Sequence, residues 1–338
     1  LERFFIMIQD ATNYDSDDEA AAQLDDILDR GGDPNFILIS ETRHGITEMT
    51  ILAVAVLFHR PRLVQVLLNH NASMNAAFAD GFRTILMFAA TLSFDQEIFE
   101  ALIATGTDVN ATNAANGRTA LHYAASTFHA EATIECLLDN GAHVEARDGT
   151  GQTPLMQAVS SSHSENALAL LRRGANPSAT VEREDRGSRL GLEMPLVPPY
   201  CRGASVLMLS CYGGLGDVVL ELIARGVDVN ARDVHGQTAL MYAAAGLRHN
   251  NRDDEEPVQN EDGWRHCIVE LIRAGANIEA EDSRGRRARG FLNDRIIDRL
   301  YRDILREQLT WLMIGQRLRR NRNAASLPVE LVDVIRRF

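Results

Sequence analysis

The sequence predicts an all-α solenoid, in which short pairs of helices repeat along the chain and stack on one another. The first observation is a threonine or serine that recurs at nearly constant spacing. The second is an apolar pair that follows these residues and precedes a glycine. The third is composition: the 338 residues are 45% hydrophobic and 24% charged. This is ordinary for a folded protein, and no run approaches the roughly 20 apolar residues of a membrane-spanning helix.

The spacing of the anchor residues gives the period of the repeat. The anchors are Thr50, Thr84, Thr119, Thr153, Ser205 and Thr238. Successive anchors are separated by 34, 35, 34, 52 and 33 residues. A fixed period in this range is typical of stacked repeats. The gap of 52 residues therefore indicates one repeat interrupted by an insertion.

Each position of the repeat has a physical reason. The threonine suits a helix N-cap, where its hydroxyl accepts a free backbone N–H. Pro154 follows one threonine at the first helical position, where a missing N–H does no harm. Pairs such as Leu137 and Leu138 fit the buried side of a second helix. Asn110 and Asn230 are expected to stabilise the loop that leads to the next repeat. The second helices are expected to end at glycines that tolerate a left-handed backbone, namely Gly141, Gly174, Gly226 and Gly275.

The repeated motif resembles the ankyrin repeat. The stretch Asn116-Gly-Arg-Thr-Ala-Leu-His-Tyr-Ala-Ala125 leads to Leu137-Leu-Asp-Asn-Gly-Ala142, and Gly236-Gln-Thr-Ala-Leu-Met-Tyr-Ala-Ala244 leads to Leu271-Ile-Arg-Ala-Gly-Ala276. These stretches are similar to the family pattern G-x-T-P-L-H-x-A-A followed by L-L-x-x-G-A. The resemblance implies an all-α ankyrin-repeat solenoid of about six to seven repeats, with β-turn fingers and a C-terminal helical cap. It also implies a structural hydrogen-bonding role for His122.

The predicted organisation has three parts. Residues 1–44 are expected to form a degenerate N-terminal capping repeat, 45–285 the ankyrin array, and 286–338 a C-terminal helical region with an F-box-like end. The finger before Thr50 is expected to be extended, because Gly45 lies three residues earlier than the motif requires.

Two insertions interrupt the predicted array, at residues 181–203 and 247–262. Both are longer than ordinary repeat turns. Each is either a solvated loop or a partner-specific contact. The acidic composition of the second favours a solvated loop. The first contains prolines and is more hydrophobic, so both interpretations stay open for it.

The resemblance also implies a binding surface. The fingers and first helices of such stacks form a concave face, and the position between the motif Gly and Thr is expected to point outward. About a third of the candidate residues are expected to matter, because hot spots are a minority of an interface. The candidate contacts for a protein partner are Phe82, Arg83, Arg118, Tyr123, Gln152, Gln157, His235, Gln237 and Tyr242.

The end of the chain resembles the shortened F-box of poxviral ankyrin proteins. The stretch Ser326-Leu-Pro-Val-Glu-Leu-Val-Asp-Val-Ile335 follows the F-box opening L-P-x-E-L-x-x-x-I. The resemblance implies contacts with Skp1, the adaptor of cullin–RING ubiquitin ligases. The same stretch equally suits a helix that caps the open end of a solenoid. A suppressor-of-cytokine-signalling box at 309–318 is a poorer match. The Skp1-type contacts would be Leu327, Pro328, Leu331 and Ile335.

Charge and lysine content set the chain apart. The net charge is −13, yet residues 284–338 hold 14 arginines against 6 acids. All 34 basic residues are arginine, so the chain contains no lysine. Either the genome is biased toward arginine, or the chain offers ubiquitin no side-chain amine.

The four cysteines form no C-x-x-C pair and show no zinc spacing, which indicates a reduced, intracellular protein of the cytoplasm or nucleus.

The sequence contains no constellation that predicts chemistry. A Walker phosphate loop needs a lysine, and neither H-E-x-x-H nor G-x-S-x-G occurs. We therefore expect no enzyme activity, cofactor, metal or membrane contact, and the acidic balance disfavours nucleic acid. Two functions remain: a ligase substrate receptor that recruits Skp1 and cullin, or a plain scaffold or inhibitor that binds and blocks a partner. An enzyme hidden in the insertions is a weaker third.

Overall fold

The computed structural model describes residues 15–42, 45–74, 84–92, 94–182, 201–250 and 261–291. The chain divides into two compact units, Leu1–Ala175 and Asn176–Phe338. Residues 183–200 and 251–260 of the predicted insertions, and residues 292–338 of the C-terminal region, lie outside the described part. The predicted domain boundaries stay predictions.

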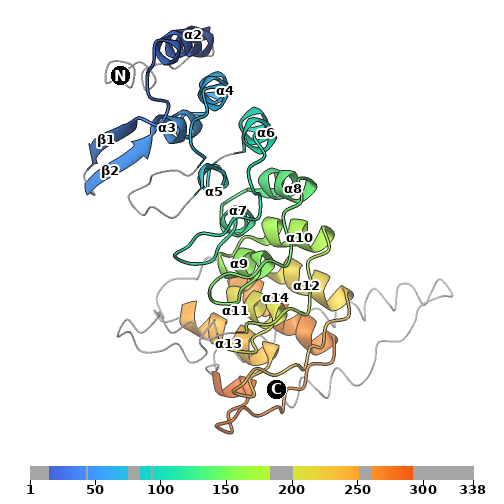
Figure 1. The fold of residues 1–338 in the computed structure, drawn as a ribbon. Coiled ribbons are helices and arrows are strands. Elements are labelled where there is room, and N and C mark those ends of the chain that lie inside the picture. Colours follow the sequence, from blue (N-terminus) through green and yellow to red (C-terminus); the bar gives the residue numbers. More distant parts are fainter. Residues whose placement is uncertain are drawn as a thin grey trace, which may run out of the picture. The chain divides into compact units, whose positions relative to one another are not determined.

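Unit 1 contains two rows of short helices (Figure 1). Each first helix packs against the next first helix and against its own second helix. The rows form because the first helices are almost entirely apolar, with small alanines that permit close approach. The first helices are α3 (Ile51–Leu57), α5 (Ile85–Ala89), α7 (Ala120–Ala125) and α9 (Pro154–Ser160). The second helices are α4 (Pro61–Asn69), α6 (Gln96–Ala104), α8 (Glu131–Asp139) and α10 (Ser164–Arg172).

Unit 2 repeats this arrangement. The first helices α11 (Val206–Gly213) and α13 (Ala239–Asn250) pack side by side, and so do the second helices α12 (Gly216–Ala224) and α14 (Glu261–Arg273). The short 3-10 helix η2 (Ala288–Phe291) packs against α13, in the place of a further first helix. The described part of unit 2 therefore has the same helix-pair architecture as unit 1.

The predicted helix ends are largely confirmed. At Thr50, Thr84, Thr153 and Ser205 the side-chain hydroxyl accepts the N–H of the third helical residue. Thr119 instead engages the ring of His122. At Thr238 the hydroxyl is buried and has no partner within the described residues, so capping is not observed there. The four predicted C-terminal glycines all have left-handed backbones, with φ between 76° and 89°.

The N-terminal part of unit 1 is a half repeat. Helix α2 (Asp15–Asp29) packs on α4, where the second helix of a preceding repeat would lie. Strands β1 (Ile37–Thr42) and β2 (Gly45–Thr50) then pair antiparallel, with Ile37 opposite Thr50 and Thr42 opposite Gly45. This hairpin replaces the usual short turn and confirms the expected extended finger.

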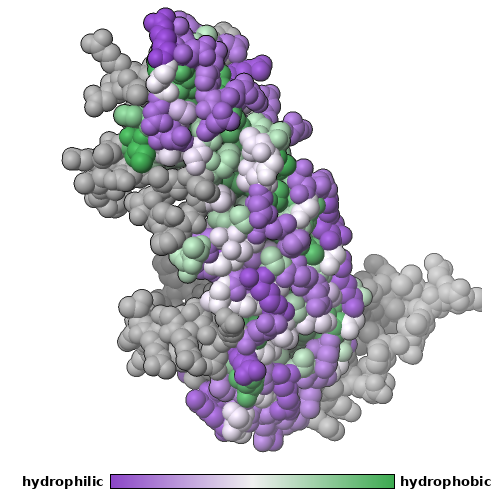
Figure 2. Space-filling model, in the orientation of Figure 1, coloured by the Kyte–Doolittle hydropathy of each residue, from purple (hydrophilic) through white to green (hydrophobic). Residues whose placement is uncertain are grey.

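Burial follows the repeat pattern. The core consists mainly of leucine, alanine, isoleucine and valine from both helix rows. The surface of the described residues seen in Figure 2 is mainly hydrophilic, with hydrophobic atoms in small separate areas. Among the described helices, none has the length and apolar character needed to cross a membrane.

Candidate functional site: the finger surface

Two finger turns of unit 2 are each organised by an aspartate side chain that accepts backbone N–H groups. In unit 2, Asp233 Oδ1 accepts the N–H groups of His235 and Gln237, both at 2.8 Å. Asp282 Oδ1 accepts those of Arg284 and Arg286 at 2.9 and 2.8 Å. Both aspartates are at least 93% buried. These carboxylates therefore fix the finger backbone and are not available to a partner.

Neighbouring fingers are joined through their backbones. In unit 1, the N–H of Gly149 donates to the carbonyl of Asn116 at 2.7 Å. In unit 2, Val234 donates to Arg202 at 3.2 Å and Ser283 donates to His235 at 2.8 Å. We call these linked turns the finger ladder. A bonded ladder holds its outward side chains in place before a partner arrives, which lowers the entropy lost on binding.

Asparagines join the loops at the other end of the fingers. Asn110 donates from Nδ2 to the carbonyl of Gly141 at 2.9 Å and accepts the N–H of His143 at 2.7 Å. Asn230 makes the same pair of bonds, to Gly275 at 3.1 Å and from Asn277 at 2.7 Å. The predicted loop-stabilising role is confirmed and extends further, because each amide links two successive repeats.

His122 is a buried structural residue, as the resemblance implies. Its Nδ1 accepts the N–H of Thr119 at 3.2 Å, and its Nε2 donates to the carbonyl of Gln152 in the next repeat at 3.1 Å. Burial lowers the pKa of the His122 imidazole below its ordinary value. A neutral ring with both nitrogens bonded fits this position, and it has no acid–base role.

Several predicted contact residues lie inside the array. The expectation that the side chain before the motif threonine points outward is wrong for Gln152 and Gln237, which are 4% and 1% exposed. Tyr123, Gln157 and Tyr242 are also buried, at 6%, 7% and 0%. A side chain covered by its own chain offers little area to a partner.

The tyrosines are buried for a specific reason. Tyr242 donates from its hydroxyl to Asp233 Oδ2 at 2.9 Å, and burial together with this carboxylate raises the pKa of the phenol. Tyr123 accepts from Asn113 Nδ2 at 2.7 Å. Each tyrosine therefore stabilises its own finger turn through a hydrogen bond of its hydroxyl group.

Two predicted contacts stay accessible. Arg118 is half-buried, bonds Gln157 at 2.8 Å and lies 3.5 Å from Asp148. His235 is exposed at the tip of its finger. Phe82 and Arg83 lie outside the described residues. Arg118 and His235 are therefore the predicted contacts that we carry forward.

The structure adds exposed residues to the finger ladder of unit 2 that sequence reasoning did not select. Val234 is 53% exposed, and Arg202 and Arg284 are also exposed. The signal was present in the sequence, since Val234 is an apolar residue at the tip of a turn that is otherwise polar. With His235 they form a mixed apolar and basic surface that suits protein contact.

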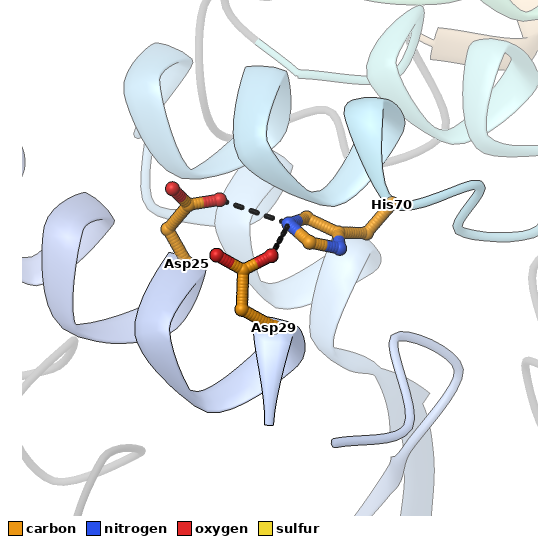
Figure 3. A group of neighbouring side chains, drawn as sticks. All are labelled: Asp25, Asp29 and His70. Carbon is orange, nitrogen blue, oxygen red and sulfur yellow. Dashed lines mark hydrogen bonds and ion pairs between the residues drawn. The ribbon is translucent and has the colours of Figure 1, made fainter. Parts of the chain in front are cut away.

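Two exposed clusters bring possible metal ligands together: Asp25, Asp29 and His70, and His129, Glu131 and Glu165. In the first, both aspartates of α2 point toward the imidazole at the end of α4 (Figure 3), with Nε2–Oδ1 distances of 2.8 and 3.8 Å. The groups already bond one another across two helices. The cluster therefore attaches the capping helix α2 to the first complete repeat.

Comparison with known proteins agrees with this architecture. Residues 86–181 match the family model described as ankyrin repeats in three copies. Among solved structures, the chain is similar to the ankyrin repeat domain of Bcl-3, described as a unique member of the IkappaB protein family. The identity is 22%, the TM-score is 0.53, and the match covers 75% of this chain and 98% of that one. No curated protein matches the chain.

These findings define the class of protein as an all-α helical-repeat solenoid. Residues 86–181 match ankyrin repeats, and such repeats indicate a protein–protein interaction module. As many as 545 solved chains match, so the fold alone does not identify a partner.

Proposed function

We propose that this chain is the substrate receptor of a cullin–RING ubiquitin ligase. The finger ladder holds a target protein, and the C-terminal end recruits Skp1. The observation that carries the proposal is the L-P-x-E-L stretch beginning at Leu327, which follows an array of repeats that supplies a protein-binding surface. The contacts to Skp1 would come from the apolar residues Leu327, Pro328, Leu331 and Ile335. These residues lie outside the described part of the chain.

The absence of lysine supports the same proposal. A substrate receptor is held close to the site where ubiquitin is transferred to lysine amines. A chain with 34 arginines and no lysine keeps its positive side chains without offering such an amine. It would therefore pass ubiquitin to the target and avoid modification of its own side chains.

The target would contact the exposed side chains of the finger ladder. In unit 2 these include Val234, His235, Arg202 and Arg284. An apolar residue among arginines favours a partner surface with a small apolar patch and acidic groups.

A pull-down with purified Skp1 tests the ligase link. We expect the wild-type chain to retain Skp1, and the Leu327→Ala/Pro328→Ala double variant to lose at least tenfold, because it removes two apolar anchors of a small interface. The matched control is His235→Ala, which alters the finger surface and should retain Skp1 fully.

The opposite outcome has a clear meaning. A wild-type chain that does not retain Skp1, or a double variant that binds as well as the wild type, refutes the ligase proposal. The plain ankyrin scaffold or inhibitor would then be the better description, with residues 327–338 as a cap.

A further inference from the structure

Phe128 is the most exposed large hydrophobic side chain among the described residues, at 71%. It lies in the turn between α7 and α8, away from the finger turns in the sequence. This turn spans residues 126–130, whereas the corresponding turn of the next repeat spans only residues 161–163. The extra length places an aromatic residue at the tip of the turn.

The turn that carries Phe128 is firmly held. Asn166, fully buried on α10, donates to the carbonyl of Thr127 at 2.7 Å and accepts the N–H of Ala130 at 3.1 Å. His163 also donates to the carbonyl of Ser126 at 3.1 Å. The turn is therefore fixed on both sides of Phe128 by the next repeat. An exposed ring on a fixed turn loses little conformational freedom when a partner covers it.

The preceding repeat shows that a long turn does not by itself expose an aromatic residue. Its turn between α5 and α6 spans residues 90–95 and is one residue longer than the turn that carries Phe128. There the aromatic residue is Phe94, which is only partly exposed and packs on Phe99 with ring centroids 5.4 Å apart. Phe128 has no such apolar cover, and its nearest rings are those of His129 and His163, at 3.9 and 5.7 Å.

Two carboxylates lie beside His129, whose ring is 3.9 Å from that of Phe128. His129 Nδ1 bonds Glu165 Oε2 at 2.8 Å, and these two atoms and a carboxylate oxygen of Glu131 all lie within 4.8 Å of one another. Hydrogen bonding to His129 lowers the pKa of Glu165, so this carboxylate is charged at neutral pH. Glu97, Glu131 and Glu165 each lie in the first turn of their helix. Acidic side chains therefore lie at the starts of three successive second helices, in the row that follows the Phe128 turn.

We propose that Phe128, Glu131 and Glu165 form a docking site for an arginine-bearing segment of a partner protein. We call this set the Phe128 site. A guanidinium group stacks on the exposed ring through a cation–π contact and bonds the two carboxylates. The apolar neighbours of that arginine in the partner cover the rest of the ring. This surface lies on the helix turns of unit 1, and the proposal depends neither on the finger contacts nor on Skp1.

The chemistry favours arginine over other groups. A planar guanidinium can stack on an aromatic face and still direct its N–H groups at two carboxylates, which a lysine ammonium does less well. An acidic segment would be repelled by Glu131 and Glu165. A purely apolar segment would bury these two carboxylates with His129 as their partner and would supply no cation of its own.

Selection from a random 12-residue peptide library on phage tests the proposal. The wild-type chain serves as bait, and binders that also bind Phe128→Ala are removed. The ring is exposed, so this variant is expected to keep the wild-type unfolding midpoint. We expect the remaining peptides to contain an arginine beside apolar residues. Their affinity should fall at least fivefold for Phe128→Ala and for Glu165→Gln, and it should weaken as salt is added.

The results that would overturn the proposal are equally definite. One is a selection in which wild-type and Phe128→Ala baits enrich the same peptides. Another is a set of Phe128-dependent peptides that lack basic residues. As a control for nonspecific attraction to an acidic chain, Glu221→Gln on α12 should leave the affinity of the selected peptides unchanged.

Discussion

A single buried imidazole shows how the array uses polar side chains. His122 is completely buried, and its two ring nitrogens join a helix N-terminus to the next repeat. Neighbouring repeats have methionine at the corresponding position, as at Met87 and Met156. Methionine fits this position in the same row of helices but cannot donate to the carbonyl of Gln152. Methionine is therefore a suitable replacement for measuring how much the hydrogen bonds of His122 contribute to stability.

His122→Met is expected to lower the free energy of unfolding by about 1 kcal/mol at pH 8, the scale of one buried hydrogen bond. Burial lowers the pKa of His122 in the folded state below its ordinary 6.5. Below that pH the unfolded chain binds a proton that the folded chain resists, so wild-type stability falls as the pH decreases. The difference between wild type and variant should therefore shrink from pH 8 to pH 5.5.

Urea unfolding followed by circular dichroism at several pH values measures this difference. A gap that stays constant or widens on acidification would show that the folded protein accommodates the protonated imidazole.

At the scale of one element, helix α2 is attached to the array by polar contacts, some of which stabilise its docking while one weakens it. Asp25 and Asp29 bond His70, and Asp17 Oδ2 accepts the N–H of Arg62 at 3.2 Å. Asp17 is only 5% exposed, and its other carboxylate oxygen has no partner within the described residues. Burial raises the pKa of Asp17, although the N–H of Arg62 partly opposes the effect. The ionised carboxylate therefore weakens the docking of α2.

Asp17→Asn is expected to stabilise α2 at pH 7 by about 1 kcal/mol, because the amide stays neutral and still accepts from Arg62. The raised pKa means that the unfavourable contribution appears as the pH rises above the ordinary value of 3.8. The gain should therefore vanish in acid. Hydrogen exchange of the peptide spanning Asp15–Asp29 measures it.

Slower exchange in the variant at pH 7 is the expected result. Faster exchange would mean that attraction to Arg60 and Arg62 outweighs the cost of burial. Glu19→Gln, which alters an exposed side chain of the same helix, is the matched control and should change little.

Over the whole molecule, the same asparagine bridge occurs in both compact units. Asn110 and Asn230 each make one donated and one accepted bond to the following loop. Asn110→Ala and Asn230→Ala are each expected to lower the free energy of unfolding by about 1–2 kcal/mol, since each removes two bonds at a partly exposed position. Urea unfolding measures both.

Thr112→Ala is the control for the Asn110 change, because it alters an exposed residue of the same finger. If the asparagine variants are as stable as this control, water replaces the bridges at no cost.

The sequence predicted most of the fold because its signals are local. The anchor hydroxyls, the left-handed glycines and the position of Pro154 depend on a few neighbouring residues, and the structure confirms them except for the capping role of Thr238. The burial of Gln152 and Gln237 depends on how the folded chain packs around the finger, and the spacing of the motif along the chain does not encode this packing. Phe128 was missed for a related reason. An aromatic in a turn can pack, as Phe94 does, or stay exposed, and the difference lies in the surrounding repeats.

The two asparagine bridges also bear on how such a chain can grow. In unit 1 the bridge joins residues 31 positions apart, whereas in unit 2 it joins residues 45 positions apart. The donor and acceptor atoms nevertheless meet at nearly the same distance. The same hydrogen bond between an asparagine and the following loop therefore forms whatever the number of residues between α13 and α14. Added sequence can accumulate at that point through small duplications without disturbing the register of later repeats, which gives evolution, or a protein engineer, a place to install a new recognition element.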